Sequence, residues 1–117
     1  QNAADRYAAL LEGVVGTPPL EAGVTSSWAQ YVIQLPQGSN RDNICQSLTN
    51  SGVPTAIYYP VPMHRQPPYT HYPVSACNLP VTMDLCDHVL ALPMHPYLET
   101  AQQVHIASSL KNALATA

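Results

Sequence analysis

The side chains with the most chemistry to offer lie in one run, Val53–Tyr72, which reads VPTAIYYPVPMHRQPPYTHY. This run holds four of the seven tyrosines, two of the five histidines and five of the twelve prolines in the chain. A tyrosine can stack its ring on a ligand and also donate a hydrogen bond, and an imidazole can donate or accept one. The run therefore predicts a ligand-binding wall. A stiff, proline-rich connection whose tyrosines only cover the core is the alternative.

Catalytic groups are harder to find in the rest of the chain. Three widely spaced cysteines, Cys45, Cys77 and Cys86, have no flanking motif that would mark a nucleophile, so we interpret them as packing residues. Schiff-base chemistry needs a lysine amine with a lowered pKa, but the sole lysine, Lys111, is expected on an exposed helix face. The chain is thus expected to hold no catalytic residue of its own.

The histidines do not predict a metal site. The spacing of His64, His71 and His95 matches no common set of metal ligands, and no carboxylate lies beside them in the sequence. Imidazoles that form hydrogen bonds in a polar pocket are the better interpretation. His88 and His105 fall inside predicted helices, where we expect partly exposed, structural roles.

Composition argues against several classes of function. Four Lys and Arg residues against seven Asp and Glu give a net charge of −3, so nucleic-acid binding has no electrostatic support. Charged residues make up 9% of the chain, against roughly a quarter in an average protein, which indicates that a partner covers part of the surface. No apolar run is long enough to span a membrane, and the odd number of cysteines fits reduced thiols in a cytoplasmic protein.

Helix and strand patterns alternate along the chain. Apolar spacing and breaker residues predict helices over Gln1–Glu12, from Asn40 to Gly52, from Thr82 to about Val89 and from Thr100 onward, and strands over Ser27–Leu35, Thr55–Tyr59 and Val89–Met94. Three short strands are too few for a doubly wound sheet. The sequence therefore predicts an α+β fold, with a small three-stranded, largely antiparallel sheet covered by helices on one face.

Helix caps are predicted at three of these positions. Ser39 or Asn40 can accept hydrogen bonds from the first free amides of the second helix, and Thr82 is expected to cap the third. Thr100 and Gln103 have the spacing of a capping box at the start of the last helix. In that last helix, Val104, Ala107, Leu110 and Leu114 are expected to form the buried face.

Four blocks of sequence resemble a known family. They are SSWAQYVIQLP at 26–36, the Arg41–Asp42 pair that begins a helix, GVPTAIYYPVPMHRQPPY at 52–69 and LALPMHPYL at 90–98. Together they resemble the C-terminal small domain of the DegT/DnrJ/EryC1/StrS family, which comprises pyridoxal-phosphate-dependent sugar aminotransferases of the aspartate aminotransferase-like fold type I. The resemblance covers essentially the whole chain, and its YYPxPxHxQ and LPMHPY blocks are specific in combination.

The resemblance implies a longer polypeptide. In the family a large domain holds pyridoxal phosphate, its lysine and the acid that pairs with the pyridine nitrogen, and nothing in this sequence matches those groups. Residues 1–117 are therefore expected to be a single C-terminal small domain without the large one, an interpretation that the start at Gln1 rather than Met supports. One face would then pack on the absent large domain and on the second subunit of a homodimer, which would account for the low charge.

The activity that the resemblance implies is amino transfer, expected from glutamate, to a keto group of a UDP- or dTDP-linked sugar. Within the family the blocks look most like bacterial enzymes that aminate the 3-keto position of UDP-linked N-acetylhexuronic acids for lipopolysaccharide and other surface polysaccharides. By position, the resemblance implies a sugar-nucleotide wall made of Tyr58, Tyr59, His64, Arg65, Tyr69, Met94 and His95. A solvated arginine, and a turn fixed by Pro93 and Pro96, remain the alternatives for Arg65 and for the Met94–His95 pair.

Other functions stay open. Some relatives carry a histidine in place of the cofactor lysine and dehydrate deoxysugars, and the position that decides between them is not in this sequence. A noncatalytic module that binds sugar nucleotides or another protein is a candidate from a different class. A structural fragment with no ligand affinity is the third.

Overall fold

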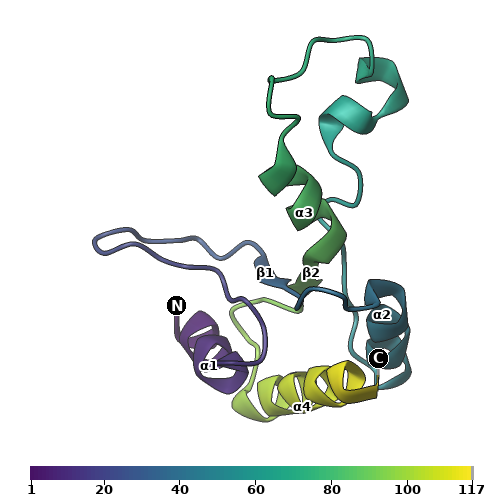
Figure 1. The fold of residues 1–117 in the computed structure, drawn as a ribbon. Helices are drawn as coiled ribbons and strands as arrows, with labels where there is room; N and C mark the ends of the chain where they lie inside the picture. The colour runs from purple at the N-terminus through teal and green to yellow at the C-terminus, as the bar shows by residue number, and fades with distance from the viewer. Residues whose placement is uncertain (117) are drawn as a thin grey trace.

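A computed structural model describes residues 1–116. Its elements follow in the order α1 (Asn2–Leu11), β1 (Tyr31–Gln34), α2 (Arg41–Asn50), the short 3₁₀ helices η1 (Met63–Arg65) and η2 (Pro67–Tyr69), α3 (Pro80–His88), β2 (Val89–Leu92) and α4 (Thr100–Thr116). The predicted α+β class is confirmed. Figure 1 shows α1, α2 and α4 on one side of the small sheet, with α3 and the segment before it projecting away from this body. None of the helices within residues 1–116 combines the length and the apolar character needed to cross a membrane.

The sheet has two antiparallel strands, so the prediction of three was wrong. β1 and β2 pair along all four residues of each strand. The predicted strand Thr55–Tyr59 pairs only at Ala56, which exchanges two backbone hydrogen bonds of 2.8 and 3.3 Å with Ala91. Pro54 and Pro60, which lack an N–H group, flank this segment, and the chain leaves the sheet between them. A single bridge is all that this stretch contributes.

β1 is also shorter than the predicted strand Ser27–Leu35. Trp28 adopts a left-handed backbone with φ 51°, which an extended strand cannot accommodate. Its indole packs 5.6 Å from the Tyr31 ring, and Nε1 donates a hydrogen bond of 3.1 Å to Oε1 of Gln1. The ladder therefore starts after this turn, at Tyr31.

The core lies between the sheet and the three helices of the body. It is built from side chains that alternate along the strands and repeat along the helices: Tyr31 and Ile33 of β1, Leu90 and Leu92 of β2, Tyr7 and Leu11 of α1, Ile44 and Leu48 of α2, and Ile106 and Leu110 of α4. The opposite face of the sheet carries Val32 and Ala91, which lie opposite each other in the ladder. This second face, which the helices of the body leave uncovered, holds the groove described below.

The cap predicted for α2 is confirmed. The Asn40 side chain accepts a hydrogen bond of 3.0 Å from the backbone N–H of Asn43, and Asp42 lies in the first turn, where the helix dipole favours an acid. Ile44 and Leu48 are fully buried, as their spacing predicts. Local sequence thus suffices to place this helix.

The caps predicted for α3 and α4 were wrong. α3 begins at Pro80, two residues before Thr82, because proline is well suited to the first turn of a helix. In the first turn of α4 the Gln102 side chain, not that of Gln103, accepts a hydrogen bond of 2.8 Å from the backbone N–H of Glu99. Gln103 is instead fully buried and joins α4 to α1.

The buried face of α4 differs in part from the prediction. Ala107 and Leu110 are buried as expected. Val104 is 45% exposed, and Ile106 and Ala113 take buried positions instead. The helix is therefore rotated so that Gln103, rather than Val104, faces α1.

Candidate binding groove

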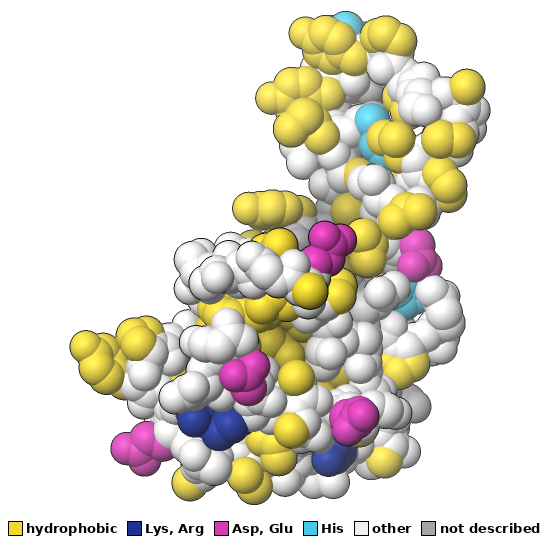
Figure 2. Space-filling model, turned by 90° about the vertical axis from the view of Figure 1, so that its left-hand side faces the viewer, with side chains coloured by type: hydrophobic (Ala, Val, Ile, Leu, Met, Phe, Trp, Pro, Cys, Tyr) yellow, Lys and Arg dark blue, Asp and Glu magenta, His cyan; other side chains and the backbone are white. Residues whose placement is uncertain are grey.

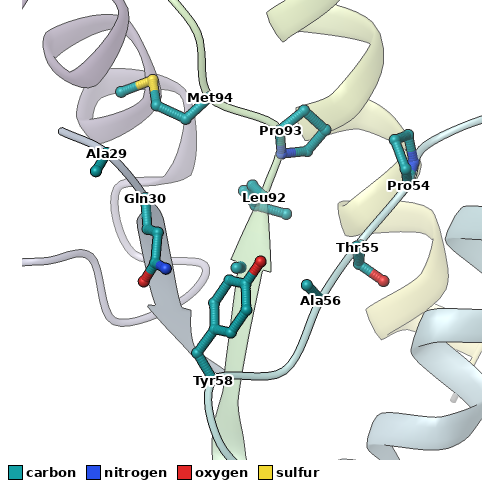
Figure 3. Close-up of a pocket in the computed structure, with 10 residues that line it drawn as sticks. Ala29, Gln30, Pro54, Thr55, Ala56, Tyr58, Leu92, Pro93 and Met94 are labelled. Atoms are coloured by element: carbon teal, nitrogen blue, oxygen red, sulfur yellow. The ribbon is translucent and has the colours of Figure 1, made fainter.

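A groove of about 270 Å³ lies on the uncovered side of the sheet, with α1 and α4 behind it (Figure 3). Three chain segments that are distant in sequence form it. The residues that line it are Ala29 and Gln30 before β1, Pro54, Thr55 and Ala56 around the isolated bridge, Tyr58, and Ala91, Leu92, Pro93 and Met94 at the end of β2. None of these side chains is charged, so the groove suits a neutral part of a ligand rather than an anionic group.

Tyr58 and Met94, two of the predicted wall residues, meet in this groove. The Tyr58 ring lies across β2 with its hydroxyl directed along the groove toward Leu92, while the Gln30 amide lies on the other rim (Figure 3). The ring also packs edge-on against Tyr59, with 5.6 Å between centroids. An aromatic face, a phenol and an amide above an apolar floor can hold a ring and its hydroxyl groups. They do not form a proton-transfer pair.

A buried tyrosine supports the groove from below. The Tyr7 hydroxyl donates a hydrogen bond of 2.7 Å to the carbonyl oxygen of Pro93, and its ring lies 4.8 Å from that of Tyr31. Burial, together with the neighbouring Tyr31, raises the pKa of Tyr7, and burial followed by the charge of Asp5 raises the pKa of Tyr31. Both phenols thus stay neutral, and Tyr7 acts as a fixed donor that holds the turn after β2.

Four other predicted wall residues lie in a projecting segment, residues 59–79, here called the arm. Tyr59 stands at its start and is 66% exposed, His64 and Arg65 are in η1, and Tyr69 ends η2. None of them lines the groove. Their role in binding a sugar nucleotide stays a prediction.

The arm exposes an unusual amount of apolar surface. Its exposed hydrophobic side chains are Tyr59, Val61, Met63, Tyr69, Tyr72 and Val74. Figure 2 shows hydrophobic side chains gathered over this upper lobe of the molecule. Contiguous apolar surface of this kind typically contacts a partner.

His64 has an unusual environment within the arm. Its Nε2 atom is buried and has no hydrogen-bond partner among the described residues, although the residue as a whole is half-buried. A buried polar atom without a partner costs on the order of 1–3 kcal/mol.

His95 does not share the groove with Met94. It lines a second cavity of about 530 Å³ on the other side of Pro93, together with Gln102 and His105 near the start of α4. The His105 Nε2 atom lies 2.9 Å from the carbonyl oxygen of Ser51, which can only accept, so this nitrogen donates. The structural role predicted for His105 agrees with this contact. In this structure the predicted pocket edge of Met94 and His95 is split between two cavities.

The interpretation of all three cysteines as packing residues was wrong for one of them. Cys45 packs against the core and Cys86 is half-buried, but Cys77 is exposed in the arm. Its sulfur lies 3.3 Å from the Ser75 hydroxyl oxygen. The Ser75 hydroxyl, and then the backbone N–H of Leu79, lower the pKa of the Cys77 thiol. No group of three or more potential metal ligands is found within residues 1–116.

The sequence did not identify the rims of the groove. Ala29, Gln30 and Thr55 line it only because the sheet brings the start of β1 and the bridge at Ala56 to either side of β2. The alternation of polar and apolar residues placed Gln30 on the face opposite Tyr31, which is the one signal that could have found it. Small and neutral side chains such as Ala29 and Thr55 have no other sequence feature that would identify them as groove residues.

Comparison with known proteins first defines the class of fold. Over 97% of its length the structure superposes with a TM-score of 0.88 on an aminotransferase of the DegT, DnrJ, EryC1 and StrS type from Brucella abortus, with 42% sequence identity, and this match spans 30% of that protein. The chain therefore has the fold of part of an aminotransferase of this type.

The sequence then gives the family. The chain belongs to the DegT/DnrJ/EryC1/StrS aminotransferase family, whose sequence model matches residues 1–111. It is 38% identical, over 96% of its length, to the UDP-2-acetamido-2-deoxy-3-oxo-D-glucuronate aminotransferase of Pseudomonas aeruginosa, and 36% identical, over 97%, to a UDP-N-acetyl-3-dehydro-α-D-glucosamine 3-aminotransferase of Acidithiobacillus ferrooxidans. The chain spans about 30% of the length of each of these relatives. The predicted family is confirmed.

Proposed function

We propose that this chain is the small domain of a nucleotide-sugar aminotransferase and helps to hold the sugar nucleotide while an amino group is transferred to a keto carbon. The keto sugar we propose is UDP-linked and carries a 3-keto group, as in a 3-keto N-acetylhexuronic acid, with glutamate as the amino donor. The names of the Pseudomonas and Acidithiobacillus relatives support this choice, because both describe UDP-linked 3-keto sugars.

The observation that carries the proposal is the uncharged groove in which Tyr58 and Met94 meet. A sugar ring presents hydroxyl groups around an apolar face, and an aromatic side chain beside an amide matches both features. Such contacts position a ligand through groups remote from the reacting carbon. The arm, with His64, Arg65 and Tyr69, is proposed to supply the polar contacts that the groove lacks.

The residues of this chain do not fit pyridoxal phosphate. The groove contains neither a lysine nor a carboxylate, and the sole lysine, Lys111, is exposed on α4. No step of a cofactor reaction can therefore be assigned to these residues. We propose that pyridoxal phosphate is held by a large domain of the complete protein, and that the exposed apolar arm contacts that domain or a second subunit.

An activity assay on the complete product of the gene tests the proposal. Incubation with pyridoxal phosphate, glutamate and a UDP-linked 3-keto sugar is expected to give the 3-amino sugar, identified by mass spectrometry. A product that has lost water instead would establish the dehydratase alternative. No turnover of any UDP- or dTDP-linked keto sugar would contradict the proposal and leave a noncatalytic module.

A tyrosine substitution tests the role of the groove. Tyr58→Ala removes its aromatic wall, and burial of a large apolar side chain contributes about 1.5–3 kcal/mol, so the KM for the nucleotide sugar should rise about tenfold or more. Tyr97→Ala is the matched control, because Tyr97 is 85% exposed and does not line the groove. Equal KM values for the two variants would show that the groove does not bind the sugar nucleotide.

A further inference from the structure

The helix that carries the arm is scarcely packed against the rest of the protein. α3 contains no fully buried residue: its apolar side chains Val81 and Leu85 are 71% and 38% exposed, and Met83 is half-buried. Helices are normally held in place by an apolar face turned toward the core. Figure 1 shows α3 joined to the body only at its C-terminal end, where it runs directly into β2. Apolar burial therefore does not fix the direction in which α3 and the arm project.

Polar contacts at one carboxylate brace α3 against β1. Asp84 accepts hydrogen bonds from Nε2 of Gln37, at 2.7 Å, and from Nε2 of Gln34, at 3.3 Å. His88, one turn later, lies with Nδ1 2.8 Å from the Asp84 carbonyl oxygen and 3.2 Å from its carboxylate. Hydrogen bonds to a charged group are stronger than those between neutral groups. Asp84 thus links α3 to β1 and to the turn that follows it.

An arginine from α2 holds the end of the same helix. Arg41 Nη1 donates to the carbonyl oxygens of Cys86, at 2.6 Å, and Val89, at 3.2 Å. A cation in the first turn of a helix is unfavourable, so Arg41 does not stabilise α2, whose first residue it is. The last carbonyls of α3 are where a cation is favoured. Arg41 therefore stabilises the C-terminal end of α3 rather than the start of α2.

We propose that Asp84 and Arg41 are positioning residues that set the direction of α3 and so hold the arm over the bound sugar nucleotide. This inference rests on the proposed function of the arm. α3 has nine residues, a length of about 13 Å, so a tilt of about 10° at its C-terminal end moves the other end by about 2 Å. A misplacement of about 1 Å at a substrate contact can lower a reaction rate about 100-fold. Loss of the contacts of either Asp84 or Arg41 should therefore displace the arm.

Matched substitutions on α3 test the carboxylate brace in the complete gene product. Asp84→Ala removes the contacts to Gln34 and Gln37, while Asp87→Ala makes the same chemical change at an exposed position of the same helix. Both changes favour the isolated helix, because alanine has the highest helix propensity. Asp84→Ala is expected to lower kcat/KM for the nucleotide sugar about 100-fold, through a raised KM as well as a lower kcat, with kcat/KM for glutamate unchanged. Asp87→Ala should match the wild type.

The arginine brace has its own conservative control. Arg41→Met is expected to raise the same KM, whereas Arg41→Lys should restore it, since a single nitrogen of Arg41 makes both contacts and an ammonium group can do the same. Wild-type kinetics in both Asp84→Ala and Arg41→Met would overturn the proposal.

Hydrogen exchange of the same variants does not depend on catalysis. Amides of α3 and of the arm should exchange faster in Asp84→Ala and Arg41→Met, with α1 and α4 unchanged. Faster exchange throughout α1 and α4 would show general destabilisation and overturn the positioning role. If the wild-type protein transfers no amino group, the proposed function fails, but the exchange pattern still decides whether these residues brace the arm.

Discussion

Replacing Gln103 by leucine should destabilise the attachment of α1 to α4. Gln103 is fully buried, and its Nε2 donates a hydrogen bond of 2.7 Å to the Ala3 carbonyl oxygen, while its Oε1 accepts one from Arg6 Nε. Another nitrogen of the Arg6 guanidinium, Nη2, donates a hydrogen bond of 2.9 Å to the Leu98 carbonyl oxygen. Leucine keeps the apolar volume but leaves Ala3 and Arg6 without these partners.

The expected cost follows from the kinds of hydrogen bond lost. A neutral bond contributes about 0.5–1.5 kcal/mol and a bond to a charged group about 1.5–3 kcal/mol, so Gln103→Leu should cost about 2–4.5 kcal/mol. Gln102→Leu is the matched control, because the neighbouring Gln102 is exposed and makes one contact, with the Glu99 N–H. Its loss should cost about 1 kcal/mol or less.

Urea unfolding measures the loss in free energy of unfolding for each leucine variant. Hydrogen exchange of the α1 and α4 peptides shows whether the loss is confined to these two helices. A difference of less than about 0.5 kcal/mol between the two leucine variants would refute the reasoning. Combining Arg6→Met with Gln103→Leu gives a second test, because replacing both partners with apolar groups removes the unpaired donor. The double variant should be more stable than the sum of the single changes predicts.

Two further predictions concern the core and the exposed cysteine. Leu48→Ala should lower the free energy of unfolding by about 2–5 kcal/mol, because Leu48 is fully buried and its removal leaves a cavity; calorimetry or urea unfolding measures the change, and a loss below about 1 kcal/mol would contradict the packing described. Cys77 should react with iodoacetamide faster than Cys45 at neutral pH, since the Ser75 hydroxyl lowers its pKa and increases the thiolate fraction. Ser75→Ala should shift the pH dependence of this alkylation to higher pH, and an unchanged pH profile would argue against the contact.

The parts of the fold that the sequence predicted are those with local causes. α2 has its cap at Asn40 and its apolar face at Ile44 and Leu48 within a dozen residues, so spacing alone locates it. The strands were less predictable, because a strand exists only where a neighbour pairs with it. Thr55–Tyr59 has the composition of a strand, yet only Ala56 finds a partner.

The candidate site divides in the same way. Tyr58 and Met94 come from conspicuous sequence blocks, and the resemblance to a family brought them together in one prediction. Their separation from His95 could not be foreseen, because the two cavities depend on how Pro93 turns the chain after β2. The predicted wall residues in the arm lie outside the groove in this structure. Their role in binding the sugar nucleotide therefore stays a prediction.

Two polar side chains make contacts that spacing did not predict, and both contacts join segments that are distant in the sequence. Gln103 contacts a residue 100 positions away, and Asp84 one 50 positions away. Hydrophobic periodicity shows which side of an element is buried, but a hydrogen bond between distant segments leaves no periodic trace. α3 is joined to the body mainly through such contacts, so its direction depends on a few polar side chains. α1 packs on the core through Tyr7 and Leu11 and is also tied to α4 by Gln103. α2 is held by Ile44 and Leu48 in the core, so the loss of one of its polar side chains should have far less effect on the position of α2 itself.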